Sequence, residues 1–64
     1  MNALTVGLIP ATLDPDGPII NRLRLDSTTV IASFDPKQIS FDTAAQFLRS
    51  VYGTAVTITA GVPQ

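Results

Sequence analysis

The acidic side chains of this 64-residue sequence are five aspartates, and they are the first candidates for chemistry. Two carboxyl groups that converge in a cleft can act as general acid and general base, and Asp14 and Asp16 could meet in this way. Four of the aspartates, however, lie beside Pro, Gly or Ser, where Asp forms turns through its own backbone. The fifth falls in the first turn of a predicted helix. We therefore interpret all of them as structural: Asp14, Asp16, Asp26, Asp35 and Asp42.

The segment from Asp14 to Gly17 resembles the opening of a calcium-binding loop. An EF-hand loop that begins at Asp14 needs Gly at its sixth position and Glu at its twelfth. Ile19 and Leu25 stand at these positions. The pattern therefore predicts no metal site.

Cysteine and histidine are both absent from the sequence. Their absence excludes disulfides, thiolate and imidazole metal ligands, a Cys nucleophile and the commonest general base at neutral pH. The serines have no His to activate them, and no pattern places Lys37 beside a serine. We expect no enzymatic activity and no cofactor.

Arg22 and Arg24 form the main basic feature, with side chains about 7 Å apart on one face of a predicted strand. They could bind phosphate or acidic groups of a partner, or they could form a solvated outer face paired with nearby aspartates. A two-stranded ribbon that presents arginines is one known way to read DNA. Only Lys37 and Arg49 add further cations, and the net charge is −1. This balance argues against nucleic acid as the partner.

Charged residues make up only 14% of the sequence, whereas 45% of the residues are hydrophobic. An ordinary soluble domain has about 25% charged residues, and a small domain has much surface to cover. Apolar surface that charges do not cover usually contacts a protein partner. Since disulfides and metals are excluded, self-association is the remaining support for so small a core. We expect a homo-oligomer or a subunit of a larger assembly.

Residue periodicity predicts one small α+β domain over residues 1–64: a four-stranded sheet with one helix packed on one face, in the order β-β-β-α-β along the chain. The strands are expected at 3–9, 19–25, 29–34 and 54–60, and the second and third should form an antiparallel hairpin. Ser40 is the expected N-cap of the helix, and Gly53 is the expected C′ residue, which follows the last helical turn. Residues 10–18 form a proline-rich loop with a turn at 15–17, and residues 61–64 form a terminal tail.

Alternation assigns the side chains of these elements to two sheet faces. The helix should bury an apolar stripe that contains Ala44, Phe47, Leu48 and Val51. The third strand should bury Val30, Ala32 and Phe34. We expect the outer face, opposite the helix, to carry Ile20, Arg22, Arg24 and Ile31.

The predicted partner-binding residues extend beyond that outer face. Phe41 and Tyr52 flank the helix and are suitable interface anchors, because aromatic residues are common at binding hot spots. The proline-rich loop is either a simple connection or a stiff arm with Leu13 as its apolar tip. The full set of candidates is Leu13, Ile20, Arg22, Arg24, Ile31, Phe41 and Tyr52.

These features predict a non-catalytic structural protein that acts through protein–protein contacts in an oligomer or lattice. A small phage virion component, which decorates or cements a capsid, fits the size and the composition. The alternative is a small regulator, either a DNA-binding β-ribbon dimer or an inhibitor of a host enzyme. The N-terminal apolar stretch lacks a positive n-region and ends at Pro10, so we expect no signal peptide. We expect no membrane span, and a cytoplasmic or virion-associated location.

Overall fold

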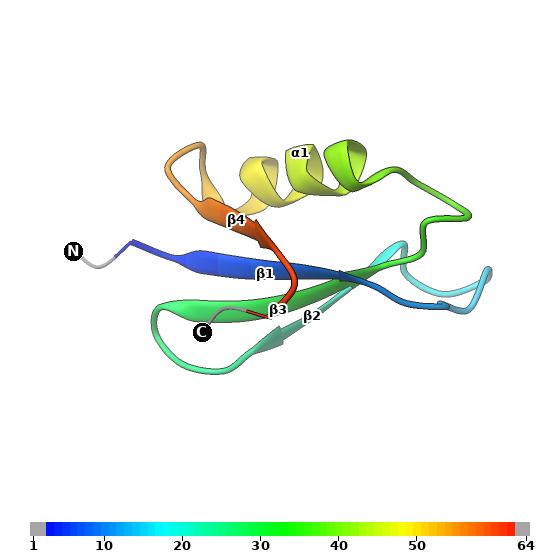
Figure 1. The fold of residues 1–64 in the computed structure, drawn as a ribbon, viewed down its shortest axis with the longest axis horizontal. Helices are drawn as coiled ribbons and strands as arrows, with labels where there is room; N and C mark the ends of the chain where they lie inside the picture. The colour runs from blue at the N-terminus through cyan, green and yellow to red at the C-terminus, as the bar shows by residue number, and fades with distance from the viewer. Residues whose placement is uncertain (1–2, 63–64) are drawn as a thin grey trace.

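The computed structural model describes residues 3–62 and contains a mixed sheet with one helix on one of its faces (Figure 1). The strands are β1 (Thr5–Pro10), β2 (Ile20–Arg24), β3 (Thr29–Phe34) and β4 (Thr57–Ala60), and the helix is α1 (Phe41–Tyr52). The strand order across the four-stranded sheet is β2-β3-β1-β4. This arrangement confirms the predicted α+β fold and the β-β-β-α-β order.

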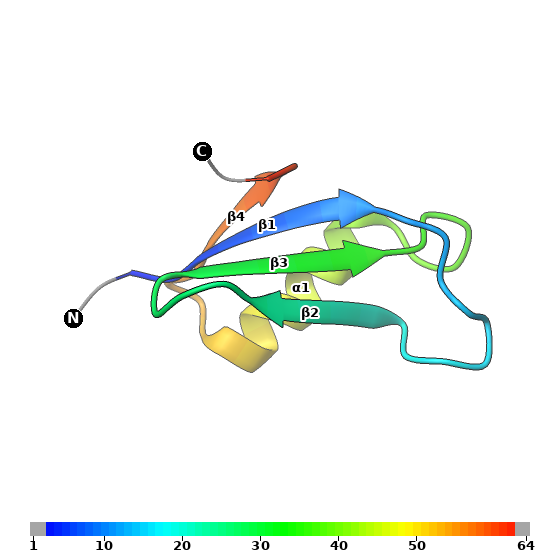
Figure 2. The same cartoon turned by 90° about the horizontal axis from the view of Figure 1, so that it is seen from below.

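Strand β1 lies in the middle of the sheet and is parallel to both of its neighbours, β3 and β4. Strand β2 is antiparallel to β3, which confirms the predicted hairpin. The connection from β3 through α1 to β4 therefore spans β1 and joins parallel strands. Figure 2 shows the sheet from the face that the helix does not cover.

Helix α1 begins and ends where its capping residues predict. The Ser40 hydroxyl accepts a hydrogen bond from the Thr43 backbone N–H at 3.1 Å. The helix ends at Tyr52, and the N–H of Gly53 donates to the Arg49 carbonyl at 2.8 Å. Gly53 has φ 96° and ψ 160°, a conformation that only glycine adopts readily. The sequence therefore encodes both ends of the helix locally.

Three strands differ from their predicted bounds, and β2 (Ile20–Arg24) is one residue shorter at each end than predicted. Strand β1 extends to Pro10, which is tolerated because a residue at the end of a strand needs no N–H donor. Strand β4 begins at Thr57 instead of residue 54, because the chain first reverses in a turn that the Val56 N–H closes onto the Gly53 carbonyl at 3.3 Å.

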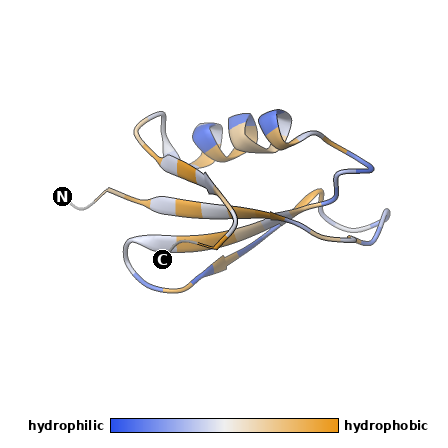
Figure 3. Cartoon of the chain, viewed as in Figure 1, coloured by the Kyte–Doolittle hydropathy of each residue, from blue (hydrophilic) through white to orange (hydrophobic). Residues whose placement is uncertain are grey.

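The core lies between α1 and the β1–β3 part of the sheet, and the outward side of the helix is hydrophilic (Figure 3). Leu48 is fully buried, but Phe47 is 46% exposed and Val51 is 43% exposed, so the prediction that both lie in the core is wrong. Phe47 lies about 100° around the helix axis from Leu48, which places it on a flank of the helix. The buried core residues are Val6, Leu8, Val30, Ala32, Phe34, Ala44, Ala45, Leu48 and Val56.

The proline-rich loop contains the expected turn, in which the Gly17 N–H donates to the Asp14 carbonyl at 2.9 Å. The predicted tail is described as far as Val62, whereas Pro63 and Gln64 lie outside the described residues. Across residues 3–62, no helix has the length and apolar character needed to cross a membrane.

Candidate protein-binding site

Asp35 holds the loop after β1 against the connection between β3 and α1. Its side chain is only 6% exposed and accepts hydrogen bonds from the Leu13 N–H, the Lys37 N–H and the Gln38 side-chain amide. The Lys37 N–H, followed by the Leu13 N–H, lowers the pKa of this carboxyl group below its ordinary value. Donors that favour the charged carboxylate are typical of a structural anchor.

The other aspartates with resolved contacts also stabilise turns. Asp14 accepts a bond from the Asp16 N–H at 2.9 Å. The Asp26 carboxylate accepts hydrogen bonds from the Thr28 N–H at 2.8 Å and from the Thr28 hydroxyl at 3.0 Å. The bond from the Thr28 N–H is the main cause that lowers the pKa of Asp26. Within the part of the chain that the structure describes, no three His, Cys, Asp or Glu side chains converge to hold a metal ion.

Arg22 and Arg24 lie on the helix side of the sheet, so the prediction that they form its outer face is wrong. Arg22 pairs with Ala32 and Arg24 pairs with Val30, and both partners are buried under α1. Residues that are directly paired across two strands project to the same face. Ile20, which pairs with Phe34, therefore lies on the helix side as well.

The contacts of the two arginines fix their positions. The Arg22 Nη1 donates to the Tyr52 hydroxyl at 3.3 Å, and the guanidinium lies 5.6 Å from the centroid of the Tyr52 ring. This distance is within the range of a cation–π interaction. The Arg24 Nη1 donates to the carbonyls of Asp26 and Ser27 at 3.2 and 3.3 Å. Each guanidinium thus makes its contacts within the domain through one nitrogen, Nη1, and both residues remain exposed.

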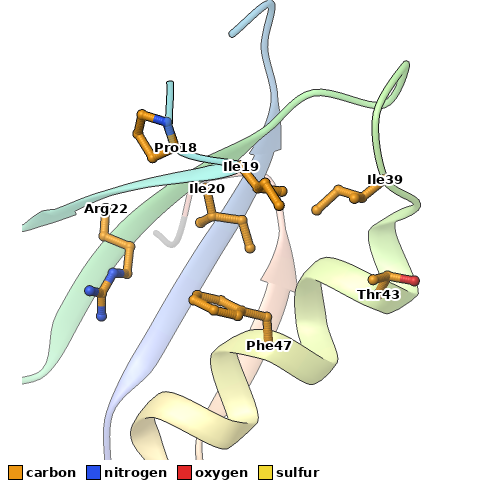
Figure 4. A pocket seen from close by; sticks show the side chains of 7 residues that line it. All are labelled: Pro18, Ile19, Ile20, Arg22, Ile39, Thr43 and Phe47. Carbon is orange, nitrogen blue, oxygen red and sulfur yellow. The ribbon is translucent and has the colours of Figure 1, made fainter. Parts of the chain in front are cut away.

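A groove of about 410 Å³ lies between β2 and α1. Figure 4 shows Ile20 and Phe47 on opposite sides of it, with the Arg22 guanidinium at one end. Arg22 is the one charged side chain among the residues that line the groove: Pro18, Ile19, Ile20, Arg22, Ile39, Thr43 and Phe47. The groove thus combines apolar walls with a positive charge at its end.

The opposite face of the sheet is not covered by the helix (Figure 2) and carries no charged residue on its four strands. Leu23 on β2 is 63% exposed, and it pairs with the half-buried Ile31 of β3. We call this surface the open face; its strand residues are Thr5, Gly7, Ile9, Asn21, Leu23, Thr29, Ile31, Ser33, Thr57 and Thr59. Of the predicted candidates, only Ile31 lies on the open face.

The remaining candidates lie elsewhere. Leu13 is half-buried and its N–H is bound to Asp35, so it belongs to the anchored base of the loop and not to its tip. The Phe41 ring packs edge-on against Phe34, with 5.9 Å between the centroids, and is half-buried against the core. Tyr52 positions Arg22. The structure thus brings together Ile20, Arg22 and Tyr52, whereas Leu13 and Ile31 lie apart from them. Phe41 shares one core neighbour with Ile20, because both contact Phe34.

Sequence reasoning missed several exposed apolar residues near β2. Leu23 and Leu25 flank the edge of the sheet, and Phe47 and Ile19 line the groove. The pairing register of the hairpin is the signal that could have located them, because it fixes which residues of β2 share a face with the core.

Comparison of the chain with protein-family models, with curated proteins and with solved structures finds no match.

Proposed function

We propose that this chain is a non-catalytic assembly protein that buries its open face against neighbouring copies of itself. The observation that carries the proposal is the absence of charge from this face, together with the exposure of Leu23. Two sheets that pack face to face form a common arrangement, with about 10 Å between them. Apolar burial contributes about 25 cal/mol per Å², and Ile9, Leu23 and Ile31 are the large apolar residues of the open face that would supply it.

The size of the chain supports the same proposal. Small domains bury a small share of their surface on folding and often gain stability from oligomerisation. A subunit that decorates or cements a phage capsid is the specific class that we propose, because such a role needs a small, stable surface and no catalytic site. Its location would be the virion, or the cytoplasm before assembly.

The placement of the arginines favours this function over a DNA-reading ribbon. A ribbon that reads DNA presents its side chains to a groove. Here Arg22 and Arg24 lie on the helix side and donate to Tyr52 and to backbone carbonyls. No geometric feature of the described residues favours an inhibitor of an enzyme over an assembly subunit.

Sedimentation velocity over a range of protein concentrations tests the proposal. The wild-type chain should sediment as an oligomer, and Leu23→Lys should shift it toward the 6.8 kDa monomer, because a charge in the contact would lose its hydration. Gln46→Lys is the matched control, since Gln46 is exposed on α1 and away from the open face. A wild-type chain that remains monomeric, or an equal effect of the two lysines, would contradict the proposal.

A further inference from the structure

Strand β2 leaves one edge of its backbone unpaired. It is the terminal strand of the sheet, and residues 21–24 are exposed. The Leu25 N–H donates to the Thr29 carbonyl of β3 at 2.9 Å. Because an antiparallel strand directs alternate residues to its two sides, the N–H and C=O groups of Ile20, Arg22 and Arg24 point away from β3. The edge therefore offers three residues for pairing with another strand.

The opposite edge of the sheet offers less. The N–H groups of Thr57 and Gly61 donate to the carbonyls of Leu4 and Leu8, so within β4 only Ile58 and Ala60 direct their backbone groups outward. Short edge strands pair poorly with other chains. Strand β2 is the better site for an added strand.

Helix α1 provides a second contact surface beside the β2 edge. Phe47 and Val51 are one helical turn apart on the flank that faces β2, and both are more than two-fifths exposed. In Figure 2 the C-terminal turn of α1 lies beyond the outline of β2. A strand added at this edge would lie beside that flank, and its helix-side residues could cover Phe47 and Val51.

The charges of β2 indicate what kind of strand fits. Arg22 and Arg24 project to the helix side, where they would face the side chains of an added strand. Opposite charges at directly facing positions stabilise a strand pair, whereas like charges destabilise it. Carboxylates at the two facing positions would therefore favour binding.

A second copy of β2 does not meet this requirement. The antiparallel register that uses all three edge residues places Arg22 opposite Arg22 of the second copy. If the register of the second copy moves by two residues toward the hairpin turn, Arg22 lies opposite Arg24. If it moves by two residues in the other direction, Arg24 lies opposite Pro18, which has no N–H to donate.

We propose that the β2 edge binds an extended acidic segment of a partner protein as a fifth, antiparallel strand. Read from its N-terminus, the segment carries an acidic residue opposite Arg24, an apolar residue beside Leu23, an acidic residue opposite Arg22, any residue beside Asn21, and an apolar residue opposite Ile20. This is binding by strand addition, in which main-chain bonds give affinity and alternate side chains give specificity. The proposal does not depend on self-assembly through the open face.

The test uses a blocked synthetic peptide, acetyl-Thr-Glu-Val-Glu-Thr-Val-Thr-amide, titrated into ¹⁵N-labelled protein and followed by NMR. We expect the amide signals of Ile20, Arg22 and Arg24 to shift. The same peptide with Lys in place of Glu should bind at least tenfold more weakly.

The double variant Arg22→Gln/Arg24→Gln should lose about tenfold in affinity for the glutamate peptide, as expected for two exposed ion pairs. Arg49→Gln is the matched control, because Arg49 is exposed on α1 and should leave the affinity unchanged.

A second pair of peptides tests strand pairing itself. N-methylation of the two Glu residues blocks the amides that would face β2 and should abolish binding, whereas N-methylation of the Val between them should not.

Equal binding of the Glu and Lys peptides, insensitivity to N-methylation, or no binding at millimolar peptide would overturn the proposal. So would shifts of the same amides on dilution without peptide, which would indicate a second copy. An equal response to a single-stranded DNA oligonucleotide would indicate a phosphate site. Repeating the titration with Thr57→Lys, which places a charge on the open face at the opposite edge of the sheet from β2, separates a failure at the edge from a failure of self-assembly.

Discussion

The backbone N–H of Leu13 donates to Asp35 Oδ2 at 3.1 Å, across 22 positions of the sequence. The same carboxylate accepts bonds from the Lys37 N–H and the Gln38 side chain. One buried aspartate thus fixes the proline-rich loop and the entry to α1 together. A solvent-exposed carboxylate would contribute far less, because water would satisfy the same donors.

Acid should destabilise the protein through Asp35. Its pKa is lower in the folded state than its ordinary value of 3.8, because the Lys37 N–H and then the Leu13 N–H bind the charged form. The resulting stability is therefore complete above the ordinary pKa and is lost as the pH falls through the lowered one. We expect the Tm of the wild type to fall more steeply than that of Asp35→Asn between roughly pH 5 and pH 2. At pH 7 the Asn variant should be the less stable protein, and parallel Tm curves would contradict this account.

Leu48 and Phe47 are neighbours in sequence but should differ in their contribution to stability. Leu48→Ala removes a fully buried side chain and should cost about 2–5 kcal/mol in the free energy of unfolding. Phe47→Ala should cost only about 1–2 kcal/mol, because the ring is nearly half exposed. Urea unfolding of both variants measures the difference. A larger loss for Phe47→Ala would place its ring in the core, as the periodicity alone predicted.

Gly53 should not tolerate a side chain. Its φ of 96° with ψ of 160° lies outside the left-handed helical region that Asn can adopt. Gly53→Ala and Gly53→Asn should therefore both lower the free energy of unfolding, by about 1–3 kcal/mol. If Asn restores the stability that Ala loses, the backbone at this position is left-handed helical instead.

Tyr52 and Arg22 should be energetically coupled. A double-mutant cycle with Tyr52→Leu and Arg22→Gln should give a coupling energy of about 0.5–1 kcal/mol in thermal or urea unfolding, since the pair is exposed and combines a hydrogen bond with ring stacking. A coupling energy near zero would mean that Arg22 is free in solution and is not positioned by the ring.

The sequence predicted those parts of the fold that depend on local chemistry. The Ser40 cap, the end of α1 at Gly53 and the turn at residues 15–17 each follow from one residue type in one position. The bounds of β4 were wrong because the turn after Gly53 depends on where the chain must meet β1. Such non-local constraints leave little trace in a single sequence.

The face of the arginines could have been predicted, but alternation alone was not enough. Alternation groups Ile20, Arg22 and Arg24 together without saying which side they occupy. A tight turn at residues 26–28 pairs Leu25 with Thr29, and therefore Arg24 with Val30, a predicted core residue. The polar character of arginine favoured the outer face, but its long side chain lets it lie over the edge of the core and still reach water.

The central claim is that neighbouring copies of this chain cover the open face, and native mass measurement of the protein as isolated from its source tests it most directly. We predict a defined multiple of 6.8 kDa, or a larger particle that contains the chain in many copies. A single unattached chain of 6.8 kDa at high concentration would contradict the account.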